Sequence, residues 1–305
     1  MVENARSLNI AANLILLVGM TYILAPLYLT ITTASQSYEF MVANGLAWVP
    51  GDQLFNNIAR IFKETRIPLQ MLNSLIVAFG SALAICVLSF LSAYTIVYFP
   101  RRWSSVVFAL ILASIMLPLD VRVITTYQVA SNVLSPINWL LDISGLNGLI
   151  AQLFGAPLLL QWRILDTHFG LIAPLVAHGM GTFLFRQTFL TLPIDLLKAA
   201  RMDGAGPIRF MLDILLPLSR TAFAALFVLT FLSGWTSYLW PLVASSTPDM
   251  QTAVVGLAKL SPGATGAIPD FPLIMAGAVI VSIVPLTMIA LLQRYLVRGL
   301  VLTEK

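Results

Sequence analysis

Charged side chains are scarce in this chain. Asp, Glu, Lys and Arg together make up 10% of its 305 residues, whereas 59% of the residues are hydrophobic. Soluble domains carry about 25% charged residues, so this composition excludes a soluble globule and indicates an integral membrane protein. The net charge of +4 is too small to indicate a nucleic-acid partner.

Cysteine is almost absent as well. The one cysteine, Cys86, lies inside an apolar run, where we expect it to act as a small packing residue. A single thiol excludes an intramolecular disulfide and any metal site built from several thiolates. His168 and His178 stand ten residues apart at a membrane-length run, and we expect structural roles for both.

Sequence motifs for catalysis are also missing. The chain has no GxxxxGK[ST] loop for binding nucleotide phosphates, so any ATP hydrolysis has to be supplied by a partner. Neither a metal-binding helix motif nor the pattern of a catalytic triad occurs. We therefore expect a chain that is not itself an enzyme and that binds no cofactor or metal.

Long apolar runs are what the chain does contain. A bilayer core of about 30 Å requires about 20 apolar residues per helix. Six runs meet this length, and they are residues 10–33, 71–99, 104–129, 168–189, 221–243 and 272–293. The prediction is an all-α membrane protein with six transmembrane helices, one domain over residues 1–305 and a core at about 68–293. The first run is longer than a signal-peptide core, so we expect it to be a retained helix.

The distribution of Lys and Arg predicts the orientation of these helices. With the N-terminus inside, the inner segments hold eleven of the 17 Lys and Arg residues. Positively charged residues favour the cytoplasmic side, so both termini and the loop at 193–219 are predicted to be cytoplasmic. Residues 34–70 and 130–167 then form extracytoplasmic loops.

The second outer loop carries an amphipathic pattern. Five of its apolar residues fall at helical spacing, and they are Leu146, Leu149, Ile150, Leu153 and Phe154. Asn147 and Gln152 fall on the other side of the predicted helix. With Trp139 and Trp162 suited to the headgroup zone, the pattern predicts an interfacial helix that contacts membrane lipid.

The inner loop at 193–219 predicts two short helices at an angle. Pro193 can start a helix, and Asp195 in its first turn suits the helix dipole. Asp203-Gly204 ends that helix, and Pro207 fits the first position of a second one. A polar helix–turn–helix between membrane helices either packs on its own bundle or docks on a partner.

This inner loop resembles the cytoplasmic coupling loop of the membrane subunits of binding-protein-dependent ABC importers. The residues at the spacing of that motif are Ala199-Ala200, Gly204, Ile214 and Leu216-Pro217. The resemblance implies that the loop seats in a cleft on an ATPase subunit, through Lys198, Ala199, Ala200, Asp203, Gly204, Ala205, Pro207 and Phe210. Lys198 departs from the motif, which opens with glutamate. Either the partner surface has changed its charge, or this position is peripheral.

Other segments extend the resemblance to most of the chain. Residues 185–189, 192–193, 234–235, 238–241, 293–294 and 297–301 resemble carbohydrate-type ABC permeases, and 116–122 and 304–305 resemble, more narrowly, permeases of sn-glycerol-3-phosphate importers. The resemblance implies a bacterial inner-membrane complex. Its other members are a second related permease, two copies of an ATPase that binds ATP and Mg, and an extracytoplasmic binding protein. Residues 135–162 form a longer insertion than the resemblance leads us to expect.

Two groups of residues are candidates for the substrate path. Asp120 and Arg122 lie at the outer part of the third run, where intramembrane charges usually face a cavity or a partner. Arg122 either meets a phosphate group, or lies at the membrane edge and pairs with Asp120. Trp235, Tyr238 and Trp240 either line a polyol path or form a seam between helices.

The resemblance to permeases of sn-glycerol-3-phosphate importers implies import of sn-glycerol 3-phosphate or a glycerophosphodiester. The same machinery importing a neutral sugar or oligosaccharide is the alternative, and it requires no phosphate-binding cation at Arg122. A secondary transporter predicts internal repeats and buried coupling-ion carboxylates, neither of which the sequence shows. A membrane-embedded enzyme requires clustered acid, base or metal ligands, and the few polar residues do not converge in the sequence.

Overall fold

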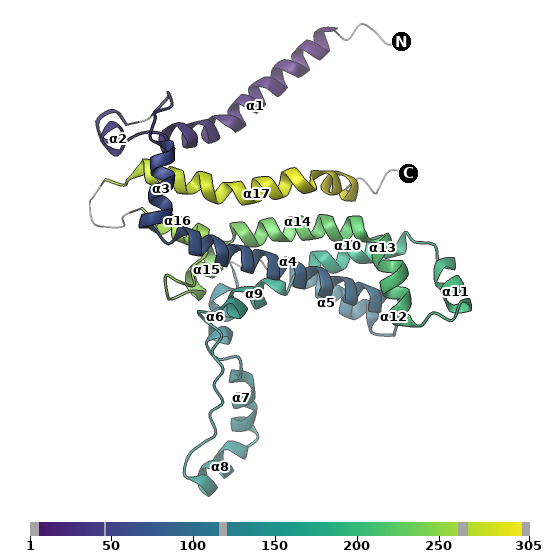
Figure 1. Ribbon diagram of the computed structural model, residues 1–305. Coiled ribbons are helices and arrows are strands. Elements are labelled where there is room, and N and C mark those ends of the chain that lie inside the picture. The colour runs from purple at the N-terminus through teal and green to yellow at the C-terminus, as the bar shows by residue number, and fades with distance from the viewer. Residues whose placement is uncertain (1–5, 46, 116–120, 262–267, 301–305) are drawn as a thin grey trace. The chain divides into compact units, whose positions relative to one another are not determined.

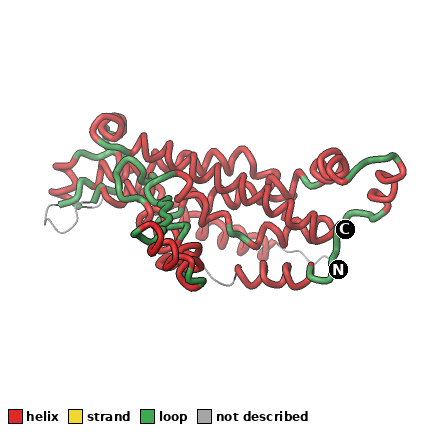
Figure 2. Tube along the Cα trace, turned by 90° about the horizontal axis from the view of Figure 1, so that it is seen from below, coloured by secondary structure: helices red, strands yellow, loops and turns green. Residues whose placement is uncertain are grey.

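The protein is described here by a computed structural model that covers residues 6–45, 47–115, 121–261 and 268–300. Within these ranges every regular element is a helix, and no strand occurs (Figure 2). Three helices are long and apolar enough to cross a membrane, or up to five if each sharply bent pair is one span. The predicted all-α membrane class is confirmed.

The chain divides into two compact units. The first comprises Met1–Leu69 and Gly256–Val284, and the second comprises Gln70–Val255 and Pro285–Lys305. The boundaries between the units fall within helices α4, α16 and α17, whose bounds are Ile67–Tyr98, Ala253–Lys259 and Phe271–Leu300.

The first unit is built from α1, α2, α3 and the beginning of α17, with α1 at Arg6–Ala34, α2 at Tyr38–Asn44 and α3 at Leu54–Glu64. The buried side-chain amide of Asn57 in α3 donates to the carbonyl oxygens of Ala34 and Gln36, at 2.9 Å each. The guanidinium of Arg60 pairs with Asp270 at 3.0 Å. Desolvation by itself lowers the pKa of Arg60, but the nearby carboxylates of Asp270 and Glu64 raise it by more. The net pKa is above the usual value, so the guanidinium stays charged. These contacts tie α3 to the end of α1 and to the start of α17.

The second unit is organised around α4, α10 (Gly179–Leu190) and α14 (Arg220–Thr236). The ring of Phe90 in α4 makes edge-to-face contacts with Phe185 and Phe189 of α10, at 5.3 Å between centroids in each case. Small residues allow close approach. A Cβ atom on Gly181 would lie 2.4 Å from the Ser89 hydroxyl. Glycine and serine at helix contacts are typical of membrane bundles, where packing rather than the hydrophobic effect drives association.

Shorter helices complete the second unit (Figure 1), and they are α5 (Ser104–Ile115), α6 (Val123–Ser131), α7 (Ser135–Ile143), α8 (Leu146–Phe154), α9 (His168–Val176) and α15 (Leu239–Ala244). A buried cluster joins α4, α6, α9 and α15 through Val77, Ala130, Leu171, Trp240 and Ala244. The indole nitrogen of Trp240 donates to the carbonyl oxygen of Gly170 at 3.3 Å.

Three of the six predicted spans are not single continuous helices. In the third, 104–129, a turn at Val121 and Arg122 directly precedes α6, so the span is interrupted there. The fourth, 168–189, bends by 50° between α9 and α10. Pro174 lies in α9 and removes a backbone donor there. The fifth, 221–243, is interrupted at Ser237 and Tyr238 between α14 and α15.

Candidate functional site

The loop at 193–219 forms the predicted pair of short helices. Helix α11 is Asp195–Met202, and Gly204 has the left-handed backbone (φ 73°) expected after a helix end. The chain is then helical over Pro207–Leu218, with Pro207 in the first turn. Within this stretch α12 (Pro207–Arg209) and α13 (Leu216–Leu218) flank a π-helical turn, η1 (Phe210–Leu215), that the sequence did not predict.

The loop is anchored on α4 and α10. The side chains of Ala200, Phe210 and Leu215 are buried in one cluster with Phe90, Tyr94 and Phe189. The hydroxyl of Tyr94 donates to the carbonyl oxygen of Pro207 at 2.8 Å. The rings of Tyr98 and Phe210 lie 5.2 Å apart in an edge-to-face contact. The two short helices are therefore held against the end of the membrane helix α4 by packing and by a hydrogen bond.

The side of the loop that faces away from α4 and α10 is not covered by other described parts of the chain. Lys198, Ala199, Asp203, Gly204 and Pro207 are exposed, Ala205 is half-buried, and Ala200 and Phe210 lie beneath them. The apolar side chains of Met202 and Ile208 are 83% and 70% exposed. The ammonium of Lys198 pairs with Asp195 at 2.8 Å. The lysine that departs from the coupling motif thus has a carboxylate partner inside the loop.

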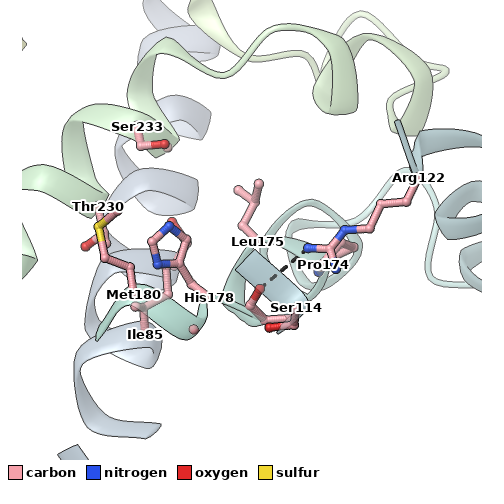
Figure 3. Close-up of a pocket in the computed structure, with 13 residues that line it drawn as sticks. Ile85, Ser114, Arg122, Pro174, Leu175, His178, Met180, Thr230 and Ser233 are labelled. Carbon is pink, nitrogen blue, oxygen red and sulfur yellow. Dashed lines mark hydrogen bonds between the residues drawn. The ribbon is translucent and has the colours of Figure 1, made fainter. Parts of the chain in front are cut away.

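A cavity of about 230 Å³ lies in the membrane bundle of the second unit, at the break between α9 and α10. Its polar lining comes from Ser81, Ser114, Arg122, His178, Thr230 and Ser233 (Figure 3). A guanidinium nitrogen of Arg122 is 3.5 Å from the carbonyl oxygen of Ala177, the residue that caps the end of α9. Among the described residues, the Nε of Arg122 and the Nδ1 of His178 are buried and have no hydrogen-bond partner. Two nitrogen-bearing side chains thus leave polar atoms available in one cavity.

Two further hollows adjoin this cavity. One, of about 460 Å³, shares Arg122, Pro174 and Ala177 with it and extends to Trp162. The other, of about 410 Å³, shares Ser114 and His178 and is lined by the hydroxyls of Ser89, Ser92 and Thr182. Ser81 and Ser92 belong to the same helix, eleven residues apart, which corresponds to about 16 Å along its axis. Arg122 thus lines both the cavity and the first of these hollows, and His178 lines both the cavity and the second.

The other candidate path residues lie elsewhere. Trp235 and Trp240 are 2% and 1% exposed within the helix packing, and Tyr238 is 42% exposed. None of the three lines these hollows. Asp120 lies outside the described residues, as do the other residues of 116–120 and residues 304–305. His168 bonds to the Asn73 side chain at 3.1 Å, consistent with its expected structural role.

His178 is the residue at this cavity that sequence reasoning did not place in the path. His178 stands between Ala177, which caps the end of α9, and Gly179, the first residue of α10. Its backbone therefore lies at the break in the fourth span. The sequence signal was present in the proline, histidine and glycines that dilute this apolar run. A break at membrane depth is tolerated where it lines a cavity, and this is where the polar groups gather.

The sequence of residues 85–301 matches the family described as "binding-protein-dependent transport system inner membrane component". The match covers more than two thirds of the chain and includes the 193–219 loop and the cavity residues Arg122 and His178. The chain belongs to this family. It is therefore an inner-membrane permease subunit of a binding-protein-dependent ABC importer.

Relatives of full length support the same assignment. The chain is 38% identical over 311 aligned positions to the sn-glycerol-3-phosphate transport system permease protein UgpE of Yersinia pestis, and 36% identical to that of Agrobacterium fabrum, with all of each chain covered. Among solved structures it is similar to a bacterial ABC transporter involved in the import of the acidic polysaccharide alginate (TM-score 0.71, 20% identity, 97% and 98% of the two chains covered). The alginate transporter in complex with its alginate pentasaccharide-bound periplasmic protein gives a TM-score of 0.62, at 13% identity over 94% and 93% of the chains. At these identities the structures confirm the fold of the permease.

Proposed function

We propose that this permease subunit carries sn-glycerol 3-phosphate, or a glycerophosphodiester, across the inner membrane. The observation that carries the proposal is the position of Arg122 at the membrane cavity, where its Nε is buried and bonds to no other described residue. A cation inside a membrane bundle is costly unless it serves a ligand or a pathway. The names of the full-length relatives, which are permeases of sn-glycerol-3-phosphate systems, support the same substrate.

The cavity and the two hollows that share lining residues with it supply a path for such an anion. Arginine binds phosphate through two parallel hydrogen bonds, and His178 adds a ring nitrogen on the other side of the cavity. Hydroxyl groups of Ser81, Ser114 and Ser233 are suited to the hydroxyls of a glycerol group. An anion that leaves Arg122 for His178 then meets Ser89 and Ser92 further along α4, in the hollow nearer the 193–219 loop.

Movement along this path requires energy from a partner. In the proposed assembly the 193–219 loop docks on one subunit of an ATPase dimer, which binds ATP and Mg, while this chain has no catalytic role. A second related permease completes the membrane domain, and an extracytoplasmic binding protein delivers the substrate. Both termini and the loop then lie in the cytoplasm. The exposed Met202, Asp203 and Ile208 meet the ATPase, and the anchoring of Pro207 on Tyr94 passes its motion to α4.

Reconstitution of the purified complex in liposomes tests this function. With the binding protein outside and ATP inside, we expect uptake of radiolabelled sn-glycerol 3-phosphate. This uptake should require both the binding protein and the membrane complex, and it should stop without ATP. A neutral oligosaccharide taken up in its place would refute the phosphate assignment and leave the importer class intact. Uptake by this chain alone, without ATP, would refute the importer mechanism itself.

A further inference from the structure

The hairpin formed by α7 and α8 buries a polar side chain and exposes its large apolar side chains. None of the nine residues of α7 is buried, and the one buried residue of α8 is Asn147. Its large apolar side chains are uncovered instead, with Trp139, Leu153 and Phe154 at 61%, 78% and 80% exposure. A hairpin folded for water would place these groups the other way round.

This arrangement is held in place by three asparagine side chains. The amide of Asn132 and the amide of Asn138 both donate to the carbonyl oxygen of Leu160, at 3.1 and 2.8 Å. The side-chain oxygen of Asn147 accepts from the backbone nitrogen of Leu158 at 2.7 Å. The returning segment is thus fixed against α7 and α8 by polar contacts, and the apolar side chains cannot turn inward without breaking them.

Charge is nearly absent from the hairpin. Residues 135–162 contain a single ionisable group, Asp142, and its carboxylate accepts a hydrogen bond from Asn147. Two tryptophans, Trp139 and Trp162, are half or more exposed. Exposed tryptophan together with leucine and an uncharged surface is typical of the interface between bilayer and water. A surface that met a soluble binding protein only transiently would spend its remaining time exposed to water, which large apolar patches do not tolerate.

The position of the hairpin in the second unit agrees with this surface. In Figure 1, α7 and α8 leave the end of the unit at which α6 and α9 lie, and extend across the direction of α4, α10 and α14. The chain enters the hairpin from α6 and returns to α9, with the backbone nitrogen of Val133 bonded to the Trp162 carbonyl at 2.9 Å. An element that leaves membrane helices sideways at their ends lies along the membrane surface.

We propose that the α7–α8 hairpin is a lipid-binding element that lies in the bilayer–water interface at the end of the bundle opposite the 193–219 loop. Leu146, Leu149 and Leu153 share one face of α8, and this face is immersed among the acyl chains together with Phe154. Asn147 lies outside this face, and its side-chain oxygen fixes α8 to the returning segment by accepting from the backbone nitrogen of Leu158. The hairpin then braces the outer end of α6, which carries Arg122 at its start.

Spin-label accessibility in the assembled complex tests this location. Leu153→Cys and, as the matched control on the neighbouring position, Gln152→Cys are made in a Cys86→Ala background, with accessible cysteines removed from the other subunits. The labelled complex is reconstituted in vesicles of phosphatidylethanolamine and phosphatidylglycerol. We expect the label at Leu153 to be relaxed by oxygen several-fold more than by a water-soluble nickel chelate, and the label at Gln152 to show the reverse preference.

The other outcomes each refute the proposal. Equal access of the nickel chelate to both labels means that the hairpin extends into water. A label at Leu153 that is immobile and shielded from both reagents means that the second permease covers the face. Shielding that appears only when the binding protein is added identifies that protein as the occupant. Retained ATP-dependent uptake by each variant shows that the labelled complexes are folded.

Discussion

The hydroxyl of Tyr94, near the end of the membrane helix α4, donates a 2.8 Å hydrogen bond to the carbonyl oxygen of Pro207, the first residue of the second helix in the 193–219 loop. The two residues are 113 positions apart in the sequence. Because that carbonyl belongs to the loop and the hydroxyl belongs to the bundle, a displacement of the loop acts directly on α4.

Removing this hydroxyl should weaken coupling without unfolding the chain. Tyr94→Phe keeps the ring and its packing but loses one hydrogen bond, which contributes about 0.5–1.5 kcal/mol. We expect transport per ATP hydrolysed to fall by about two- to tenfold, since that energy corresponds to such a change in an equilibrium. Tyr98→Phe is the matched control, because Tyr98 also packs on Phe210 and its hydroxyl has no hydrogen bond to a described residue. Equal effects of the two substitutions would contradict a specific role for the bond.

The turn at Gly204 should set the angle between the two loop helices. A Cβ at this position would meet no atom within 4 Å, so a substitution costs only the left-handed backbone, about 1–2 kcal/mol. We expect Gly204→Val to lower the amount of ATPase that co-purifies with the permease in detergent, because the β-branched residue opposes φ 73°. Gly204→Asn is the control, since asparagine adopts this conformation more readily. Loss of ATPase in both variants alike would point to side-chain contact rather than backbone geometry.

Arg122 should matter for passage of the substrate but not for its capture. Arg122→Ala removes the guanidinium from the cavity, and hydrogen bonds to charged groups contribute about 1.5–3 kcal/mol each. We expect uptake of sn-glycerol 3-phosphate to fall by about ten- to a hundredfold, while the affinity of the isolated binding protein stays unchanged. Arg163→Ala is the control, since Arg163 is an exposed arginine of the predicted outer loop at 130–167 and lines none of the three hollows. Unaltered uptake by Arg122→Ala would exclude Arg122 from the path.

The local chemistry of the loop was readable from the sequence. Gly204 and Pro207 act through their own backbone preferences, so the helix end and the new helix start followed from residue type alone. The ion pair between Lys198 and Asp195 also lies within reach of sequence reasoning, because residues three apart share a helix face. The π-helical turn at Phe210–Leu215 does not, since it accompanies the burial of both end residues against other helices.

The cavity was less predictable for a related reason. Apolar length predicts that a run crosses the membrane, but it does not register a bend such as that at Ala177 and His178. Arg122 was identified because a charge in a membrane run is conspicuous by itself. His178 becomes informative only when the break in the fourth span brings it to the same hollow, 56 residues further along the chain.

Acid should weaken the contact between Asp166 and the segment at Ser246 and Thr247. One carboxylate oxygen of Asp166 accepts from the backbone nitrogens of Ser246 and Thr247, at 3.0 and 3.1 Å, and from the Thr247 hydroxyl at 3.1 Å. Desolvation alone raises the pKa of Asp166, but these bonds and the nearby Arg163 outweigh it and hold the pKa below its usual 3.8. A carboxyl whose pKa is lower in the folded state stabilises the fold above its unfolded-state pKa, and this contribution is lost as the pH falls through the folded-state value.

The contribution of Asp166 to the melting temperature of the purified permease should therefore be constant from neutral pH down to about pH 5. It should decrease at pH values below about 4. Asp166→Asn keeps an acceptor oxygen and tolerates the positive φ of 60°, but it has no charge to lose. We expect this variant to be less stable than the wild type at pH 7, and the difference between them to shrink below pH 4. Asp52→Asn is the control, because among the described residues the Asp52 carboxylate accepts only from the neighbouring Gln53. A difference between wild type and Asp166→Asn that is constant across the pH range would show that the ionised carboxylate does not fasten this loop.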